Sequence, residues 1–198
     1  MQQERTTVIV REDTAGKRLA ALQWGWELRS GLREAGREAR DQLEKALEEL
    51  ERSSGKREKK WQSAKFEQRL AYLTGLSALR ELQQHLFAAK YESSKEYEAL
   101  TTLTIAQAVN TVAKADYRVT IVIDGLSAAS RQRVTRDLRK LKITYDKVVG
   151  GREQSSALLR LADALAGLMR DFWEGQPYAT DCYRNLIQNG LLVELHKQ

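Results

Sequence analysis

The sequence predicts an α/β domain in which helices cover a sheet. Short apolar and β-branched runs alternate with longer helix-forming stretches, which is typical of a sheet with helices on its faces. A hydrophobic content of 42% over 198 residues is enough for one well-buried core. The only proline is Pro177, so no proline-rich linker divides the chain. We therefore expect a single domain over residues 1–198.

Strands are predicted where short β-branched runs are bounded by turn residues. These runs are Thr6–Glu12, His85–Tyr91, Arg118–Asp124 and Ile143–Val149. Helices are predicted from Asp13 or Thr14 to about Arg52 with a break near Ser30–Gly31, and over Phe66–Leu82, Lys95–Ala115, Ser130–Lys140 and Ser156–Trp173. The stretch Asp181–His196 is predicted to be a last helix, which makes the chain from about residue 176 a helical extension.

Several function classes are excluded by what the sequence lacks. One cysteine, Cys182, permits no intrachain disulfide, and two histidines form no zinc motif with it. No apolar run approaches the roughly 20 residues that span a bilayer, and the N-terminus does not read as a signal peptide. We expect a soluble, cytoplasmic protein. The P-loop, the GxGxxG loop, the nucleophile elbow and the HExxH motif are all missing.

Asp124 is the first candidate functional residue. It ends the clearest predicted strand, Arg118–Asp124, and open α/β sheets bind ligands beyond the carboxyl ends of their strands. Gly125 after it permits a tight exit from the strand. Two interpretations remain open: the carboxylate belongs to a functional site, or it caps the turn or the next helix.

Asp163 is the second candidate. It lies in the apolar segment Ala157–Met169, almost opposite the face that the leucines share. Ala166 and Gly167 beside it would let this side of the helix approach the sheet closely. A carboxylate in such surroundings needs a partner or a metal ion. Besides a functional site, the sequence leaves open a backbone cap or a pair with Arg160 or Arg152.

Basic residues gather after the strand that ends at Asp124. The stretch Arg131–Lys147 holds seven Lys or Arg and two Asp, a local charge of +5, while the whole chain carries +6. In its predicted helix the buried side is defined by Val134, Leu138 and Leu141. The residues predicted to point outward are Arg133, Arg136, Arg139 and Lys140. Such a face suits a phosphate backbone, although an ordinary solvated helix gives the same pattern.

Three segments resemble the bacterial domain-of-unknown-function family 3800, which is placed in the ribonuclease-H-like superfamily. Glu58-Lys59-Lys60-Trp61 looks like the family's E-x-K-W element, and Ile121–Ser127 (IVIDGLS) surrounds Asp124. Gly151-Arg152 and then SSALLRLADALAG are similar to a serine followed by the family's "LLQLAD-x-LAG"-like helix. The resemblance extends from about Thr6 to Glu174.

The resemblance implies a ribonuclease-H-like mixed sheet flanked by helices, and metal-dependent phosphodiester hydrolysis of nucleic acid. Its catalytic and metal-binding residues would be Glu58, Asp124 and Asp163. Carboxylate oxygens suit Mg²⁺ or Mn²⁺, and two such ions can hold a scissile phosphate. The residues expected to contact nucleic acid are Lys60, Arg152 and the four outward-pointing residues Arg133, Arg136, Arg139 and Lys140.

The beginning of the sequence departs from the family, which opens with a strand ending in an Asp-Glu-Ser-Gly-like motif. Thr6–Glu12 looks instead like the family's later N-terminal strand, so we expect the chain to begin downstream of the first one. Otherwise Glu12–Gly16 (EDTAG) is a degenerate version of the motif. Either way the first aspartate is missing, and the site is expected to be incomplete or completed by another chain.

An alternative function follows from that missing aspartate. The chain would then be a catalytically inactive nucleic-acid-binding or protein-partner module, such as an accessory protein of a mobile element or a defence system. The charged helix Arg33–Arg52 could serve as an assembly arm, so a homo-oligomer is a further expectation. The sequence does not distinguish DNA from RNA as the substrate.

Overall fold

The computed structural model describes residues 4–12, 18–26, 33–57, 59–91, 96–112, 117–151 and 156–195. Its strands are β1 (Glu4–Glu12), β2 (Arg18–Trp26), β3 (Leu86–Lys90), β4 (Tyr117–Asp124), β5 (Tyr145–Gly151) and β6 (Leu192–Leu195). Its helices are α1 (Arg33–Ser53), α2 (Phe66–Leu76), α3 (Tyr97–Val112), α4 (Ala128–Lys140), α5 (Ala157–Trp173) and α6 (Pro177–Gln188), with short 3₁₀ turns η1 (Trp61–Ser63) and η2 (Arg80–Leu82).

The strands form a mixed sheet in the order β5-β4-β1-β2-β3-β6. Two outer pairs, β4 with β5 and β3 with β6, are parallel. Between them β1 runs parallel to β4, and β2 runs antiparallel to both β1 and β3. The fold is therefore mixed α/β, as the alternation of apolar runs and helix-forming stretches predicts.

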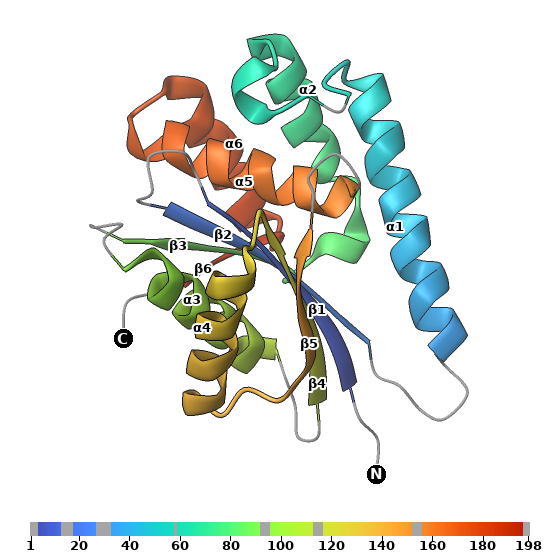
Figure 1. The fold of residues 1–198 in the computed structure, drawn as a ribbon. Helices are drawn as coiled ribbons and strands as arrows, with labels where there is room; N and C mark the ends of the chain where they lie inside the picture. Colours follow the sequence, from blue (N-terminus) through green and yellow to red (C-terminus); the bar gives the residue numbers. More distant parts are fainter. Residues whose placement is uncertain are drawn as a thin grey trace.

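Helices cover both faces of this sheet (Figure 1). The helices α3 and α4 pack on one face, while α5 crosses the other face over β1 and β2, with α1, α2 and α6 outside it. The side chains of β3 alternate accordingly, since successive residues of a strand point to opposite faces. Leu86 and Ala88 join the core under α5, and Phe87 and Ala89 join the core under α3 and α4.

The predicted helix from residue 13 or 14 to Arg52 is wrong in its first half. Arg18–Trp26 is the strand β2, which pairs with β1 over Leu19–Trp26 and with β3 over five residues. Its leucines and alanines favour a helix in isolation, but pairing on both sides decides the structure. The second half of the prediction is confirmed as α1, and the expected break at Ser30–Gly31 lies outside the described residues.

The predicted last helix, Asp181–His196, is also wrong in part. The helix α6 begins earlier, with Pro177 in its first turn, and ends at Gln188. Gly190 has a φ of +67°, a conformation that favours glycine, and turns the chain into β6. The C-terminal segment therefore adds an edge strand beside β3 as well as a helix.

Two smaller differences concern helix ends and burial. The predicted helix Phe66–Leu82 is two elements, α2 and the 3₁₀ turn η2. In α4, Val134 and Leu138 are buried as predicted, but Leu141 lies past the helix end and is 42% exposed. The other predicted strands, β1, β3, β4 and β5, are confirmed within a few residues at their ends.

Candidate functional site

Asp124 is the last residue of β4 and is half-buried. By strand alternation it shares a face with Val122, which packs against the core under α5. Gly125 leaves the strand at a φ of +65°, and its N–H donates to the carbonyl of Gly151 at 3.3 Å. The carboxylate thus stands at the carboxyl ends of β4 and β5, on the side that α5 covers.

Asp163 has a structural role that its position in the sequence left open. Its Oδ2 accepts the backbone N–H of Trp61 at 2.8 Å, which confirms the backbone cap. Gly167, one turn further along α5, faces the Trp61 ring. A Cβ at residue 167 would stand 2.0 Å from Cδ1 of that ring.

Trp61 is held by hydrogen bonds from its side chain as well as from its backbone N–H. The ring is 1% exposed, and its Nε1–H donates to Asp171 at 3.1 Å. The same carboxylate accepts hydrogen bonds from Arg69, Arg170 and Tyr178. The residues of η1 are therefore fixed to α2, α5 and α6 through one buried carboxylate.

Asp171 should make stability depend on pH in the acid range. Burial alone would raise the pKa of this carboxyl group, but the hydrogen bonds from Tyr178, Trp61 and Arg170 outweigh it and lower the pKa below its usual value. The unfolded chain then binds the proton first, so this stabilisation is complete above about pH 4 and is lost as the pH falls through the lowered pKa. We expect Asp171→Asn to unfold about 1 to 2 kcal/mol more easily at pH 7. In urea titrations followed by circular dichroism, the gap to the wild type should narrow below pH 4, and a constant gap would contradict this role.

A second buried network joins α1 to α5. Glu51, Lys56 and Arg160 are at most 3% exposed. Arg160 Nε donates to both carboxylate oxygens of Glu51 at 2.9 and 3.0 Å, and Lys56 Nζ lies 3.4 Å from Oε1. Burial lowers the pKa of Lys56, against the opposing effect of Glu51 and of Asp163.

Tyr72 packs against Lys56 of this network, and its buried hydroxyl adds to the free-energy cost of burying polar groups here. Lys56 Nζ stands 4.9 Å from the centre of the tyrosine ring. The ring is fully buried, and its hydroxyl has no hydrogen-bond partner in the described part of the chain. Burial raises the pKa of this hydroxyl well above its usual value, so it stays neutral.

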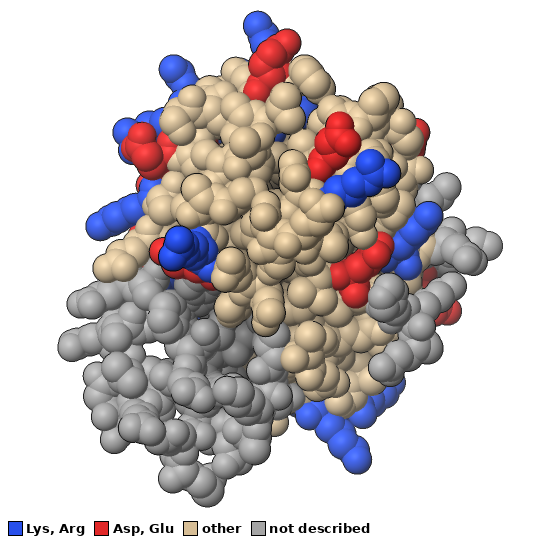
Figure 2. Space-filling model, turned by 180° about the vertical axis from the view of Figure 1, so that it is seen from behind, with Lys and Arg blue, Asp and Glu red and all other residues tan. Residues whose placement is uncertain are grey.

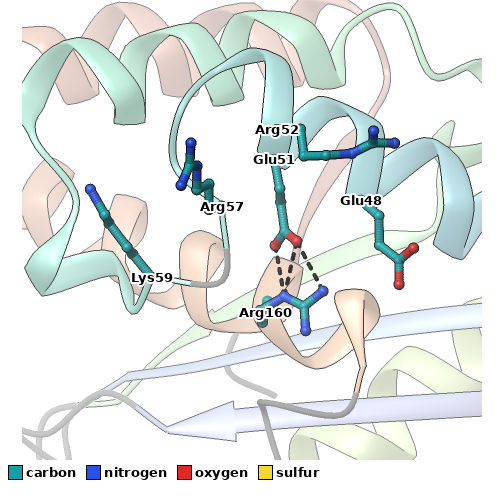
Figure 3. A pocket seen from close by; sticks show the side chains of 6 residues that line it. All are labelled: Glu48, Glu51, Arg52, Arg57, Lys59 and Arg160. Atoms are coloured by element: carbon teal, nitrogen blue, oxygen red, sulfur yellow. Dashed lines mark hydrogen bonds and ion pairs between the residues drawn. The ribbon is translucent and has the colours of Figure 1, made fainter.

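An open pocket of about 830 Å³ lies above the Glu51–Arg160 pair (Figure 3). It is bounded by the end of α1, by the turn that follows it and by the beginning of α5. The residues that line it are Glu48, Glu51, Arg52, Arg57, Lys59 and Arg160. The pocket thus has four basic and two acidic side chains on its walls.

The predicted ligand set can be followed only in part. Glu58 and Arg152 lie outside the described residues. Lys60 is exposed and precedes η1, as a surface contact requires. Over the described ranges, no group of three or more His, Cys, Asp or Glu side chains could hold a metal ion. With one oxygen of Asp163 bonded to Trp61, the described residues alone do not fit a complete Mg²⁺ or Mn²⁺ site.

The predicted basic face of α4 is exposed but partly neutralised. Arg133 donates twice to Glu98 of α3. Arg136 and Lys140 both contact Asp137 of their own helix, at 3.2 and 3.0 Å. The helix is capped by Ser127, whose hydroxyl accepts the N–H of Ser130 at 3.1 Å. The exposed cations on α4 are Arg131, Arg133, Arg136, Arg139 and Lys140.

The buried network was missed from the sequence, although a signal for it exists. Leu43 and Leu47 are buried on one face of α1, and Glu51 continues their spacing of four residues. An acidic residue on an apolar stripe predicts a buried partner of opposite charge. Arg160, a basic residue in the apolar helix α5, is that partner.

Within the described ranges, no helix combines the length and the apolar composition needed to cross a bilayer. Comparisons of the chain with protein-family models, with curated proteins and with solved structures find no match.

Proposed function

We propose that this chain binds nucleic acid through its phosphate backbone on a ribonuclease-H-like scaffold, near the carboxyl ends of β4 and β5. The mixed sheet supports the scaffold, since β1, β4 and β5 are parallel, β2 is antiparallel to its neighbours, and helices cover both faces.

The observation that carries the proposal is the basic face of α4, which begins four residues after Asp124. Its five exposed cations meet two acidic partners, Glu98 and Asp137, so an excess of positive charge remains. In the view from behind, basic and acidic side chains are interspersed over the described part of the surface and are separated by uncharged areas (Figure 2). A surface with excess cations attracts a polyanion mainly by releasing its counterions.

Binding of fluorescein-labelled 20-mers of single-stranded DNA, duplex DNA and RNA, followed by anisotropy, tests the proposal. We expect affinity to fall steeply between 50 and 200 mM salt. Arg136→Gln/Arg139→Gln should weaken binding roughly threefold to tenfold and flatten the salt dependence. The control Arg80→Gln/Arg184→Gln removes the same charge from exposed residues of η2 and α6. If the wild type binds none of the three oligonucleotides, the proposal is wrong.

Metal-dependent hydrolysis is the second candidate function, and the position of Asp124 favours it. The carboxylate stands at the strand end where the resemblance implies a ligand, on the face that carries α5 and Asp163. The same oligonucleotides, incubated with Mg²⁺ or Mn²⁺ and separated on denaturing gels, decide between the candidates. Cleavage that Asp124→Asn abolishes would establish hydrolysis, whereas binding without cleavage would leave the nucleic-acid-binding function alone.

A further inference from the structure

We infer that the pocket between α1 and α5 holds the phosphate backbone of one strand of nucleic acid, an inference that rests on the proposed function. The pocket is built by the last turn of α1, residues 57 and 59, and Arg160 near the start of α5. Its volume of about 830 Å³ lies within the range of ligand sites. The beginning of α5 follows β5, so the pocket adjoins the same end of the sheet as Asp124.

The charge of the pocket favours an anion. Its floor is the Glu51–Arg160 pair, in which the carboxylate is already satisfied by Arg160 and by Lys56 beneath it. On the walls, Arg52, Arg57 and Lys59 are exposed, and the acidic residue among them is Glu48. Glu49 also pairs with Arg52, so part of that charge is used. Among the described residues of the pocket a net positive charge remains, around a floor that is buried.

The layout of the cations favours an extended ligand over a single phosphate ion. In Figure 3, Arg57 and Lys59 stand on one side of the Glu51–Arg160 pair, and Arg52 stands on the other with Glu48. The guanidinium groups of Arg52 and Arg57 do not turn toward one point. Phosphates repeat along a nucleic-acid strand, so a strand crossing the pocket would meet cations on both sides of the floor.

Arg57 is held at the rim by its backbone. Its φ is +51°, a conformation that favours glycine, and its N–H donates to the carbonyl of Glu51 at 2.7 Å. The side chain itself is exposed. A glycine at this position would therefore keep the turn while removing the cation, which makes Arg57→Gly a variant that separates binding from folding.

The test compares the double variant Arg57→Gly/Lys59→Gln with the wild type by anisotropy of fluorescein-labelled single-stranded 20-mers over a salt series. We expect roughly tenfold weaker binding, and a salt slope shallower by about 0.7 for each charge removed. The midpoint of thermal unfolding should stay that of the wild type. Arg80→Gln/Arg184→Gln serves as the charge-matched control.

The outcomes separate this inference from the proposed function. If the wild type binds and the double variant behaves like the control, the pocket is not the site, although nucleic-acid binding survives. If inorganic phosphate at millimolar concentration protects against thermal unfolding in the wild type but not in the double variant, and no oligonucleotide binds, the ligand is a free phosphate and the inference is overturned. Absence of all binding overturns both proposals.

Discussion

Replacing Glu51 with alanine is expected to lower the free energy of unfolding by about 3 to 5 kcal/mol. The substitution removes the carboxylate that Arg160 and Lys56 both contact, while these two cations stay 3% and 0% exposed. Buried charges that lose their partner carry their full cost of desolvation, which is why breaking such a pair costs more than the pair itself contributes. The loss can be measured by urea denaturation followed by circular dichroism.

The same variant should also show a characteristic dependence on pH. Burial lowers the pKa of Lys56, and Glu51 opposes this shift, so its removal lowers the pKa further. Between that lowered pKa and about 10.5 the unfolded chain binds more protons than the folded chain, and stability rises with pH. The deficit of Glu51→Ala should therefore shrink as the pH is raised from 7 toward 10.

Glu48→Ala is the matched control, because Glu48 lies on the same helix and lines the same pocket but is exposed. Its effect should stay within about 0.5 kcal/mol. Equal losses in the two variants, or a deficit of Glu51→Ala that does not change with pH, would contradict the assignment of Glu51 as the acceptor of a buried cation pair.

The sequence predicts those elements whose local pattern agrees with their final surroundings. In β4 the run RVTIVID has five consecutive β-branched residues, and the strand is confirmed. In α4, buried Val134 and Leu138 follow the helical period. In β2, leucine and alanine favour a helix, and the strand forms because neighbours pair with it on both sides. The pairing of β2 with β3 joins residues 64 to 72 positions apart, from Leu22 with Leu86 to Arg18 with Lys90, and no local pattern contains it.

The candidate site was predictable to the same extent. The position of Asp124 at a strand end follows from its own segment. The bond between Asp163 and the N–H of Trp61 joins residues 102 positions apart, and the sequence could offer it only as one of several alternatives. The pocket depends on the turn after α1, where Arg57 adopts a positive φ. An arginine in the sequence does not predict this backbone conformation.

Gly167→Ala is expected to destabilise the protein by about 3 kcal/mol, at the upper end of the range for overpacking. The new Cβ would stand 2.0 to 2.6 Å from three atoms of the Trp61 ring. That ring cannot move aside easily, because Asp171 holds its Nε1–H and Asp163 holds the backbone N–H of the same residue. The gain in helix propensity from glycine to alanine, about 1 kcal/mol, offsets only part of this cost.

Gly75→Ala tests whether the effect comes from the tryptophan or from any methyl group added to a helix. Its Cβ would also meet a neighbour, 2.2 Å away, but that atom is the end of the flexible Leu50 side chain. We expect a loss below about 1 kcal/mol, since a leucine methyl can move to another rotamer.

A double-mutant cycle with Trp61→Leu isolates the contact. Trp61→Leu alone should be destabilising, because it removes a buried ring and the hydrogen bond to Asp171. In that background Gly167→Ala should cost little, since a leucine side chain leaves room for the methyl group. Urea denaturation of the four proteins gives the coupling energy. A coupling energy near zero would mean that Trp61 does not hold the turn with Lys59 and Lys60 against α5. The wall of the pocket would then lack the rigid support that its proposed ligand needs.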